Sequence, residues 1–445
     1  MTRIHFALLL ASAAAAATAP AGAQVTPADS AARARQDSLT LGALQDAAIE
    51  RDPRGRELAL LIEQSRLRQQ NIAAERLPTL RVEGQAQYQS DVARIPITLP
   101  GGSSPPTPPH DTYDAHLAAG QTLYDPALGA RRAVEDAQRA AAEARLRAQL
   151  YPLRQNVSDA YFTALDAQVR ISELEHAITD LEAQHRVAAA RVREGTALRS
   201  EEMALRAVML RRRQTVGEAA ANRRASLAVL TDLTGIDYDS TTLLATADLS
   251  EPVAAARESL PLLRTRPEYQ EFARQRAVLE EQERARKSQD LPRLSAFGRA
   301  GYGRPGLNPL STSFDSYWLA GVQLQWSPWT WGTGGRDRQI LALQRQIVEA
   351  EEHNFTATLR RATEQDIATI DRLERVTRED DEIVALREQI LTETRARFEE
   401  GVVTSAEYVD RQTDVLSART TRALHRVELA RARAHFLNTL GIEVR

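Results

Sequence analysis

Two carboxylates, Glu407 and Asp410, are the residues whose type and spacing point most directly to chemistry. They follow Gly401 by six and nine residues, and because they are three positions apart they are neighbours on one helical face. A close pair of carboxylates raises the local concentration of cations. Glu407 also ends the sequence T-S-A-E that begins at Thr404, a capping box in which the carboxylate stabilises a helix start. Both interpretations stay open from these residues alone.

Motifs of enzymes and of cofactor sites are weak in this chain. The eight histidines occur in no H-E-x-x-H or other ligand spacing. The glycine-rich segment 298–306 follows a strand into a loop, with no helix for a dinucleotide, and segment 332–336 lacks the lysine of a phosphate loop. We therefore expect no enzyme activity, no cofactor and no metal site.

Composition and charge narrow the class of protein. The formal net charge of −3 gives no reason to expect nucleic acid as a partner, and the absence of cysteine excludes disulfides. Residues 1–23 have the basic start, apolar core and A-x-A cleavage site of a secretory signal peptide, and a flexible segment, 24–40, follows. No later run reaches the roughly 18–20 apolar residues of a membrane-spanning helix. A segment that crosses a membrane must therefore be a strand.

The rest of the chain consists of two copies of one repeat. We predict a first structural repeat at 41–247 and a second at 248–445. The spacing between equivalent residues falls from 214 to 206 along the chain because the first copy has a longer Pro/Gly/Ser-rich loop at 96–110. The equivalent pairs are Pro78/Pro292, Leu80/Leu294, Gly84/Gly298 and Tyr88/Tyr302 at the first spacing, and Gly195/Gly401 at the second.

Each repeat has the same order of elements: a helix, two strands, a long helix and a return helix. Apolar residues of the long helices recur at spacings of three and four, as in coiled coils, and Pro152 should kink the first of them. Residues 131–194 alone would form a helix about 96 Å long, far longer than the usual helix of about 10–14 residues in a globular protein. The predicted ranges are 41–76, 79–89, 113–124, 129–194 and 197–234, then 255–289, 293–303, 317–326, 335–399 and 404–440.

The four strands have the length and pattern of membrane-spanning strands, with about 9–11 residues each and apolar residues alternating with polar ones. A soluble hairpin packed on a helix has a similar pattern, but aromatic residues near the strand ends suit a membrane interface. Four strands cannot close a barrel, since the smallest membrane barrels have about eight, so several chains must share one. The predicted membrane-interface aromatics are Trp318, Trp326, Trp329, Trp331, Tyr113 and Tyr124.

Taken in order, these features resemble the TolC family of outer-membrane efflux and secretion channels over nearly all of the expected mature chain. The resemblance rests on the opening L-T-L-G-A-L-Q-D-A-A-I-E-R-D-P and on two L-P-x-L strand entries. It also rests on the junctions Y-D-P-A-L-G-A-R-R and W-T-W-G-T-G-G-R-D-R, the two glycine tips, and the endings L-T-D-L-T-G-I-D and F-L-N-T-L-G-I-E. No single motif is specific, but their order, duplication and spacing are.

The resemblance implies a mostly α fold with a small membrane β-barrel portion. A long antiparallel coiled-coil helical barrel and four strands per chain would assemble as a homotrimer that closes a twelve-stranded barrel. It implies the exit duct of a tripartite efflux pump or a type I secretion system, in the outer membrane of a Gram-negative bacterium with a large periplasmic portion. The implied partners are a periplasmic adaptor (membrane fusion) protein, an inner-membrane pump and outer-membrane lipid.

The resemblance also assigns roles to residues. Glu407 and Asp410 match acidic positions that line the pore constriction, and Glu201 in the first copy would support the closed gate. Family members can carry a basic residue just after the second tip glycine, where this chain has two valines (402–403). The resemblance therefore does not identify the contacts that hold the closed state. The expected adaptor-docking residues at the tips are Gly195, Gly401, Arg191, Leu198, Arg397 and Thr404.

A soluble periplasmic coiled-coil scaffold or adaptor, with its strands in a small packed domain, is the alternative from another class. It predicts a protein in the soluble periplasmic fraction, whereas a channel requires detergent for extraction. The sequence does not indicate whether a channel would carry drugs, metal ions or polypeptides, nor which pump and adaptor it would serve.

Overall fold

The computed structural model describes residues 40–92, 107–239, 241–260, 264–309 and 311–444. The predicted signal peptide, nearly all of the segment 24–40 and most of the predicted loop at 96–110 lie outside the described residues. In the described part of the chain, no helix has both the length and the apolar character needed to span a membrane.

The four predicted strands are present and form one antiparallel sheet in the order β1-β2-β3-β4. Its register aligns Val82 of β1 with Leu117 of β2, Ala300 of β3 and Trp318 of β4 across the whole width of the sheet. Because successive side chains of a strand point to opposite faces, this row fixes an apolar face and a polar face for every strand. The strands are β1 (Thr79–Tyr88), β2 (Asp111–Tyr124), β3 (Arg293–Arg304) and β4 (Asp315–Gln325).

The helices follow the predicted plan, with breaks at prolines and turns. The first helix is divided near Pro53 and the first long helix at Pro152, whereas α9 has no internal proline and runs unbroken for 67 residues. The single helix predicted at 255–289 was wrong in the same way, because a short helix ends at Ser259 and α8 begins only at Pro267. The helices are α2 (Leu41–Arg51), α3 (Gly55–Ala74), α4 (Ala127–Leu150), α5 (Leu153–Arg193), α6 (Arg199–Thr234), α7 (Ser250–Ser259), α8 (Pro267–Gln289), α9 (Thr333–Glu399) and α10 (Ser405–Leu440).

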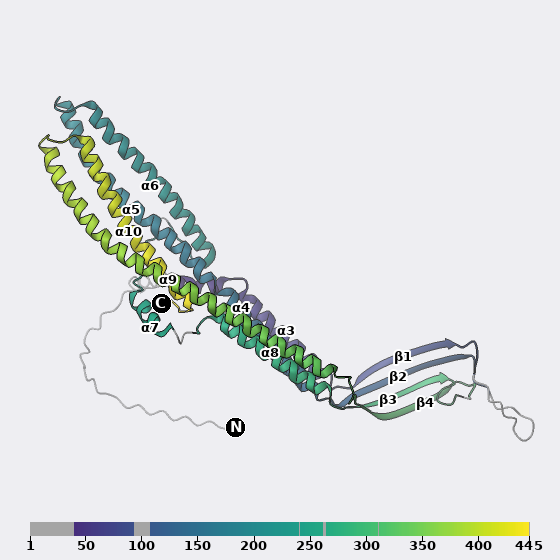
Figure 1. Cartoon of the computed structure of the whole chain (residues 1–445). Helices are drawn as coiled ribbons and strands as arrows, with labels where there is room; N and C mark the ends of the chain where they lie inside the picture. The colour runs from purple at the N-terminus through teal and green to yellow at the C-terminus, as the bar shows by residue number, and fades with distance from the viewer. Residues whose placement is uncertain (1–39, 93–106, 240, 261–263, 310, 445) are drawn as a thin grey trace, which may run out of the picture.

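The molecule is elongated, with the sheet at one end and two helical hairpins at the other (Figure 1). In the middle, α4 packs against α3 and α8, and α8 packs against α9. Beyond them α5 pairs with α6 and α9 with α10, so each repeat ends in one hairpin. The strands and the hairpin tips therefore lie at opposite ends of a helical shaft.

The main core lies where the shaft meets the two hairpins. Side chains of α2, α5, α6, α7, α9 and α10 meet there, and the rings of Tyr161 and Phe162 pack edge to face at 5.5 Å. Burial of such apolar surface is the dominant stabilising contribution to folding. The largest side chains of this core with almost no exposed surface are Tyr161, Phe162, Phe436, Leu41, Leu44, Leu165, Leu230, Leu249 and Ile370.

Both hairpins turn through the same hydrogen-bond pattern. Gly195 and Gly401 have φ angles of +74° and +77°, in the left-handed region that favours glycine. In the first tip the amide of Thr196 donates to the Arg191 carbonyl at 2.9 Å, and in the second the amide of Val402 donates to the Arg397 carbonyl at 2.9 Å. This is the Schellman arrangement that ends helices. The two copies of the repeat have therefore kept one turn geometry.

Candidate functional site

The two carboxylates at the second tip face away from the helices that pack on α10. Glu407 and Asp410 are exposed, while Tyr408 between them is buried. Within the described residues neither carboxylate forms an ion pair, whereas Asp414, one turn further on, pairs with Arg387 at 2.7 Å. The structure thus leaves two unpaired negative charges on one exposed stripe of α10.

Thr404 caps the N-terminus of α10. Its hydroxyl oxygen accepts a hydrogen bond from the Glu407 amide at 3.2 Å. The cap uses the backbone of Glu407, so its carboxylate remains exposed. A helix-start role and a cation-attracting role are therefore compatible at this residue.

Glu201 lies in the first turn of α6, at the other tip, and is half-buried. No hydrogen bond or ion pair of the described residues joins its carboxylate to Glu407 or Asp410. The next residue, Glu202, lies 3.8 Å from His185 of α5. Among the described residues of one chain, Glu201 is therefore not bonded to the carboxylates of the second tip, and its part in the gate stays a prediction.

The two tips are joined by Arg191, an expected adaptor-docking residue. Its guanidinium lies over the ring of Phe398, 5.5 Å from the centroid, and donates to the Glu399 carbonyl at 3.3 Å. Phe398 in turn stacks on Tyr408 at 5.1 Å, and burial raises the pKa of the Tyr408 hydroxyl. Sequence reasoning missed both aromatic residues, although Phe398 lies three positions before Gly401 and Tyr408 lies seven positions after it.

The other expected docking residues are accessible. Leu198, Arg397 and Thr404 are exposed, and nothing lies within 4 Å of a side chain built at Gly195 or Gly401. Val402, where family members can have a basic residue, is also exposed. The tips thus present open backbone and two apolar side chains, and the glycines are required for their φ angles rather than for close packing.

The sheet exposes its apolar face across all four strands. Val82 is 85% exposed and Trp318 is 76% exposed, although both belong to the apolar row of the register. An exposed apolar surface of this extent marks a partner, a ligand or a membrane. Other exposed members of this face are Leu80, Tyr88, Leu117, Tyr302, Val322 and Leu324.

The opposite face of the sheet is mainly polar, with Phe297 and Leu319 as large apolar residues, and its polar side chains are bonded to one another. His116 of β2 lies 2.6 Å from Asp114 and 3.3 Å from Glu83 of β1. The hydroxyl of Tyr317 on β4 reaches Asp114 across β3. This crossing needs Gly301, because a Cβ there would lie 3.0 Å from the Cζ atom of the Tyr317 ring and 2.6 Å from the His116 Cβ. One face of the sheet is thus suited to lipid and the other to water.

The predicted interface aromatics lie at both ends of the sheet. Tyr113 and Tyr124 are near the two ends of β2, and Trp326 donates its indole N–H to the Asp290 carbonyl at 3.2 Å. Trp329 and Trp331 follow β4, with ring centroids 5.8 Å apart in an edge-to-face pair. Trp318 is the fourth residue of β4 and lies on the apolar face.

Comparisons with known proteins find similar folds but no similar sequences. No protein-family model matches this chain, and no curated protein matches it in sequence. A crystal structure of CusC matches with a TM-score of 0.65 and 15% identity, over 91% of this chain and 92% of that one. The chain has the fold of an outer-membrane channel. The fold expected from the resemblance to the TolC family is thereby confirmed.

Two further channels match over similar lengths. The CmeC outer-membrane channel of Campylobacter jejuni has 15% identity and a TM-score of 0.60, over 90% of this chain and 85% of that one. The open state of the MtrE outer-membrane channel of Neisseria gonorrhoeae has 18% identity and a TM-score of 0.62, over 92% of this chain and 90% of that one. Shaft, hairpins and sheet together are therefore one known architecture.

Proposed function

We propose that the chain is the outer-membrane exit duct of a tripartite efflux pump or a type I secretion system. The observation that carries this proposal is the sheet, whose apolar face is exposed over its full width while its other face is polar. Strands with this arrangement suit a barrel wall between lipid and water. The duct conducts passively, and the described residues contain no group of side chains suited to a metal ion.

The duct requires several copies of the chain. β1 and β4 are the two edges of the sheet, and unpaired backbone groups are not tolerated in lipid. Pairing β4 of one copy with β1 of the next satisfies both edges. Three copies give the homotrimer that the resemblance implies, and its barrel lies in the outer membrane while the helical shaft extends into the periplasm.

The internal repeat supports this assembly. Within one chain, β2 and α4 of the first repeat lie beside β3 and α8 of the second. The equivalent joint between copies places β4 and α9 beside β1 and α3 of the next copy. The outer helices α3 and α9 both carry exposed apolar side chains on the shaft, which such a joint would cover. They are Leu60 and Leu67 on α3, and Ile340, Leu343 and Ile347 on α9.

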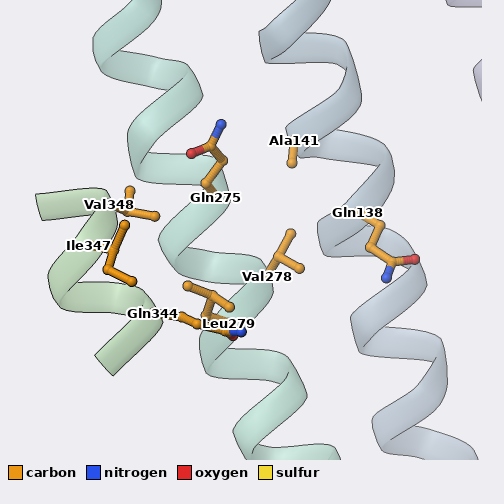
Figure 2. Close-up of a pocket in the computed structure, with 8 residues that line it drawn as sticks. All are labelled: Gln138, Ala141, Gln275, Val278, Leu279, Gln344, Ile347 and Val348. Carbon is orange, nitrogen blue, oxygen red and sulfur yellow. The ribbon is translucent and has the colours of Figure 1, made fainter. Parts of the chain in front are cut away.

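An apolar groove on the shaft adjoins this free face. It has a volume of about 450 Å³, and Figure 2 shows Ala141 of α4, Val278 and Leu279 of α8, and Ile347 and Val348 of α9 along it. Ile347 belongs both to the groove and to the exposed face of α9. A neighbouring copy on α9 would therefore cover the edge of the groove as well.

The tips serve as gate and docking site in this proposal. Glu407 and Asp410 of each copy form two rings of carboxylates around the tunnel axis and attract cations, and Glu201 supports the closed arrangement. The exposed tips receive the periplasmic adaptor, which connects the duct to the inner-membrane pump. Support for docking comes from the open backbone at Gly195 and Gly401 and from exposed Leu198 and Val402.

Cell fractionation tests this function against the soluble scaffold. The duct is expected in the outer-membrane fraction and should need detergent for extraction. In planar bilayers the extracted protein should conduct ions. A protein that stays in the soluble periplasmic fraction without detergent would support the scaffold instead, and its exposed apolar sheet would then need another partner.

A further inference from the structure

The connection between β4 and α9 projects two indole rings from the surface. Trp329 and Trp331 are 74% and 80% exposed and contact each other. The corresponding connection of the first repeat turns inward: Asp125 accepts a hydrogen bond from the Ala127 amide at 2.8 Å, and Leu128 is buried. The outward pair is therefore a feature of the second repeat and is not required by the strand-to-helix turn.

Trp331 has an unfavourable backbone conformation. Its φ angle is +53°, and no other non-glycine residue of the described chain has a positive φ. The left-handed region is disfavoured for a bulky side chain. Burial of the indole within the chain does not offset this cost, because the ring is largely exposed and its one ring contact is to Trp329. A contact that compensates this cost therefore has to come from outside the chain.

A cation lies beside the two rings. Arg336 is exposed and donates from its guanidinium to the Trp331 carbonyl at 3.3 Å. Among the described residues no carboxylate pairs with it. Two other arginines at this end of the shaft are paired, since Arg131 pairs with Glu75 and Arg286 lies 2.8 Å from Asp337. The connection thus combines two exposed indoles with one uncompensated positive charge.

We propose that Trp329, Trp331 and Arg336 form a binding surface for anionic phospholipid headgroups in the leaflet nearest the helices. This inference rests on the proposed function, because the surface continues the exposed apolar face through Leu324 and Trp326. Indole rings are favoured at the headgroup level of a bilayer, and a guanidinium binds phosphate through paired hydrogen bonds. The lipid supplies the anion that Arg336 lacks and covers both rings, which favours the strained conformation of Trp331.

Intrinsic fluorescence reports on this surface, because all four tryptophans of the chain lie on β4 or directly after it. The full-length mature protein is reconstituted into vesicles of phosphatidylglycerol and phosphatidylcholine in equal amounts, with brominated acyl chains on one lipid at a time. Bromine quenches indole fluorescence at contact. One basic side chain near an anionic membrane surface strengthens binding about fivefold, so brominated phosphatidylglycerol should quench more strongly than brominated phosphatidylcholine.

Variants test whether the stronger quenching by brominated phosphatidylglycerol depends on the proposed residues. Arg336→Gln should make the two brominated lipids quench equally, and Trp329→Phe combined with Trp331→Phe should remove most of the difference as well. Arg338→Gln is the matched control, because it removes the same charge two residues further along α9, where Arg338 donates to the Gly334 carbonyl. It should keep the preference.

The two ways of failing are distinguishable. Equal quenching by both lipids in the unmodified protein, or an undiminished preference in Arg336→Gln, would overturn the headgroup site and leave the duct intact. No quenching by either lipid would show that the sheet does not lie in a bilayer, and the proposed function would fail with it.

Discussion

Arg191 of the first hairpin lies over the ring of Phe398 of the second, with 5.5 Å between the guanidinium carbon and the ring centroid. Because Phe398 also stacks on Tyr408, one stack joins α5, α9 and α10 next to both glycine tips. A cation–π contact of this kind is worth about 0.5–2 kcal/mol, depending on its exposure to water. Opening of the tips by separation of the hairpins would break this contact.

Phe398→Ala should therefore weaken the closed state. We expect longer or more frequent open periods in planar-bilayer recordings, because the variant loses the surface on which Arg191 and Tyr408 pack. Arg193→Gln is the control, since it removes a charge from an exposed position two residues after Arg191. If Phe398→Ala and unmodified protein had the same open probability, the stack would not hold the gate.

The proposed carboxylate rings predict how a tunnel formed by several copies would select ions. Replacing both Glu407 and Asp410 by Ala should weaken cation selectivity and reduce block by multivalent cations added at the periplasmic side. Assembly should survive, because Thr404 still caps α10 through the backbone amide of residue 407. Glu382→Ala, at an exposed position of α9 far from the tip in sequence, should leave selectivity unchanged. Wild-type selectivity in the double variant would place the constriction elsewhere.

The register of the sheet predicts opposite effects for two arginine substitutions. Val82 lies in the exposed apolar row, whereas Gln85 is aligned with Asp114 on the polar face. Val82→Arg should impair membrane assembly, because a charge facing lipid near the midplane costs about 2–4 kcal/mol. Gln85→Arg should be tolerated. The measurement is the yield of folded protein in the outer-membrane fraction, and the reverse order of yields would contradict the assignment of the two faces.

A histidine near the core makes stability depend on pH. The ring of His435 lies 3.0 Å from Asp366, and this hydrogen bond raises the pKa of the imidazole. The raised pKa favours the charged ring in the folded state, so the stabilisation is complete below about pH 6.5, the unfolded value. It is lost as the pH rises through the folded value.

The contribution of His435 to the midpoint of thermal unfolding should therefore fall as the pH is raised from about 6.5 through the pKa of folded His435. His435→Gln should remove this part of the pH dependence. His353→Gln is the matched control, because it makes the same replacement at an exposed position of α9. An unchanged pH profile in His435→Gln would show that the pairing with Asp366 adds no net stability.

The sequence predicts the elements that repeat a simple pattern. Alternating residues locate the four strands and their two faces, and the glycine equivalence between Gly195 and Gly401 locates both tips. The physical reason is that a strand with one apolar face and a turn with positive φ each restrict which residue types are allowed. The division of the first helix near Pro53 was missed because a proline can also begin a helix.

Contacts between distant segments could not be predicted in this way. Arg191 and Phe398 are 207 positions apart in the chain, and neither residue type requires the other. The outward turn at Trp331 was missed for a related reason: a bulky residue with positive φ contradicts local preference and is maintained by its surroundings. The aromatic pair was predicted as part of a membrane interface, but its backbone conformation was not predicted.

The central claim is that several copies of this chain close one membrane duct, and the native mass of the detergent-extracted protein tests it most directly. The account predicts a single species of roughly three times the monomer mass, because β1 and β4 are satisfied only by pairing between copies. A stable monomer, with both sheet edges unpaired, would contradict it.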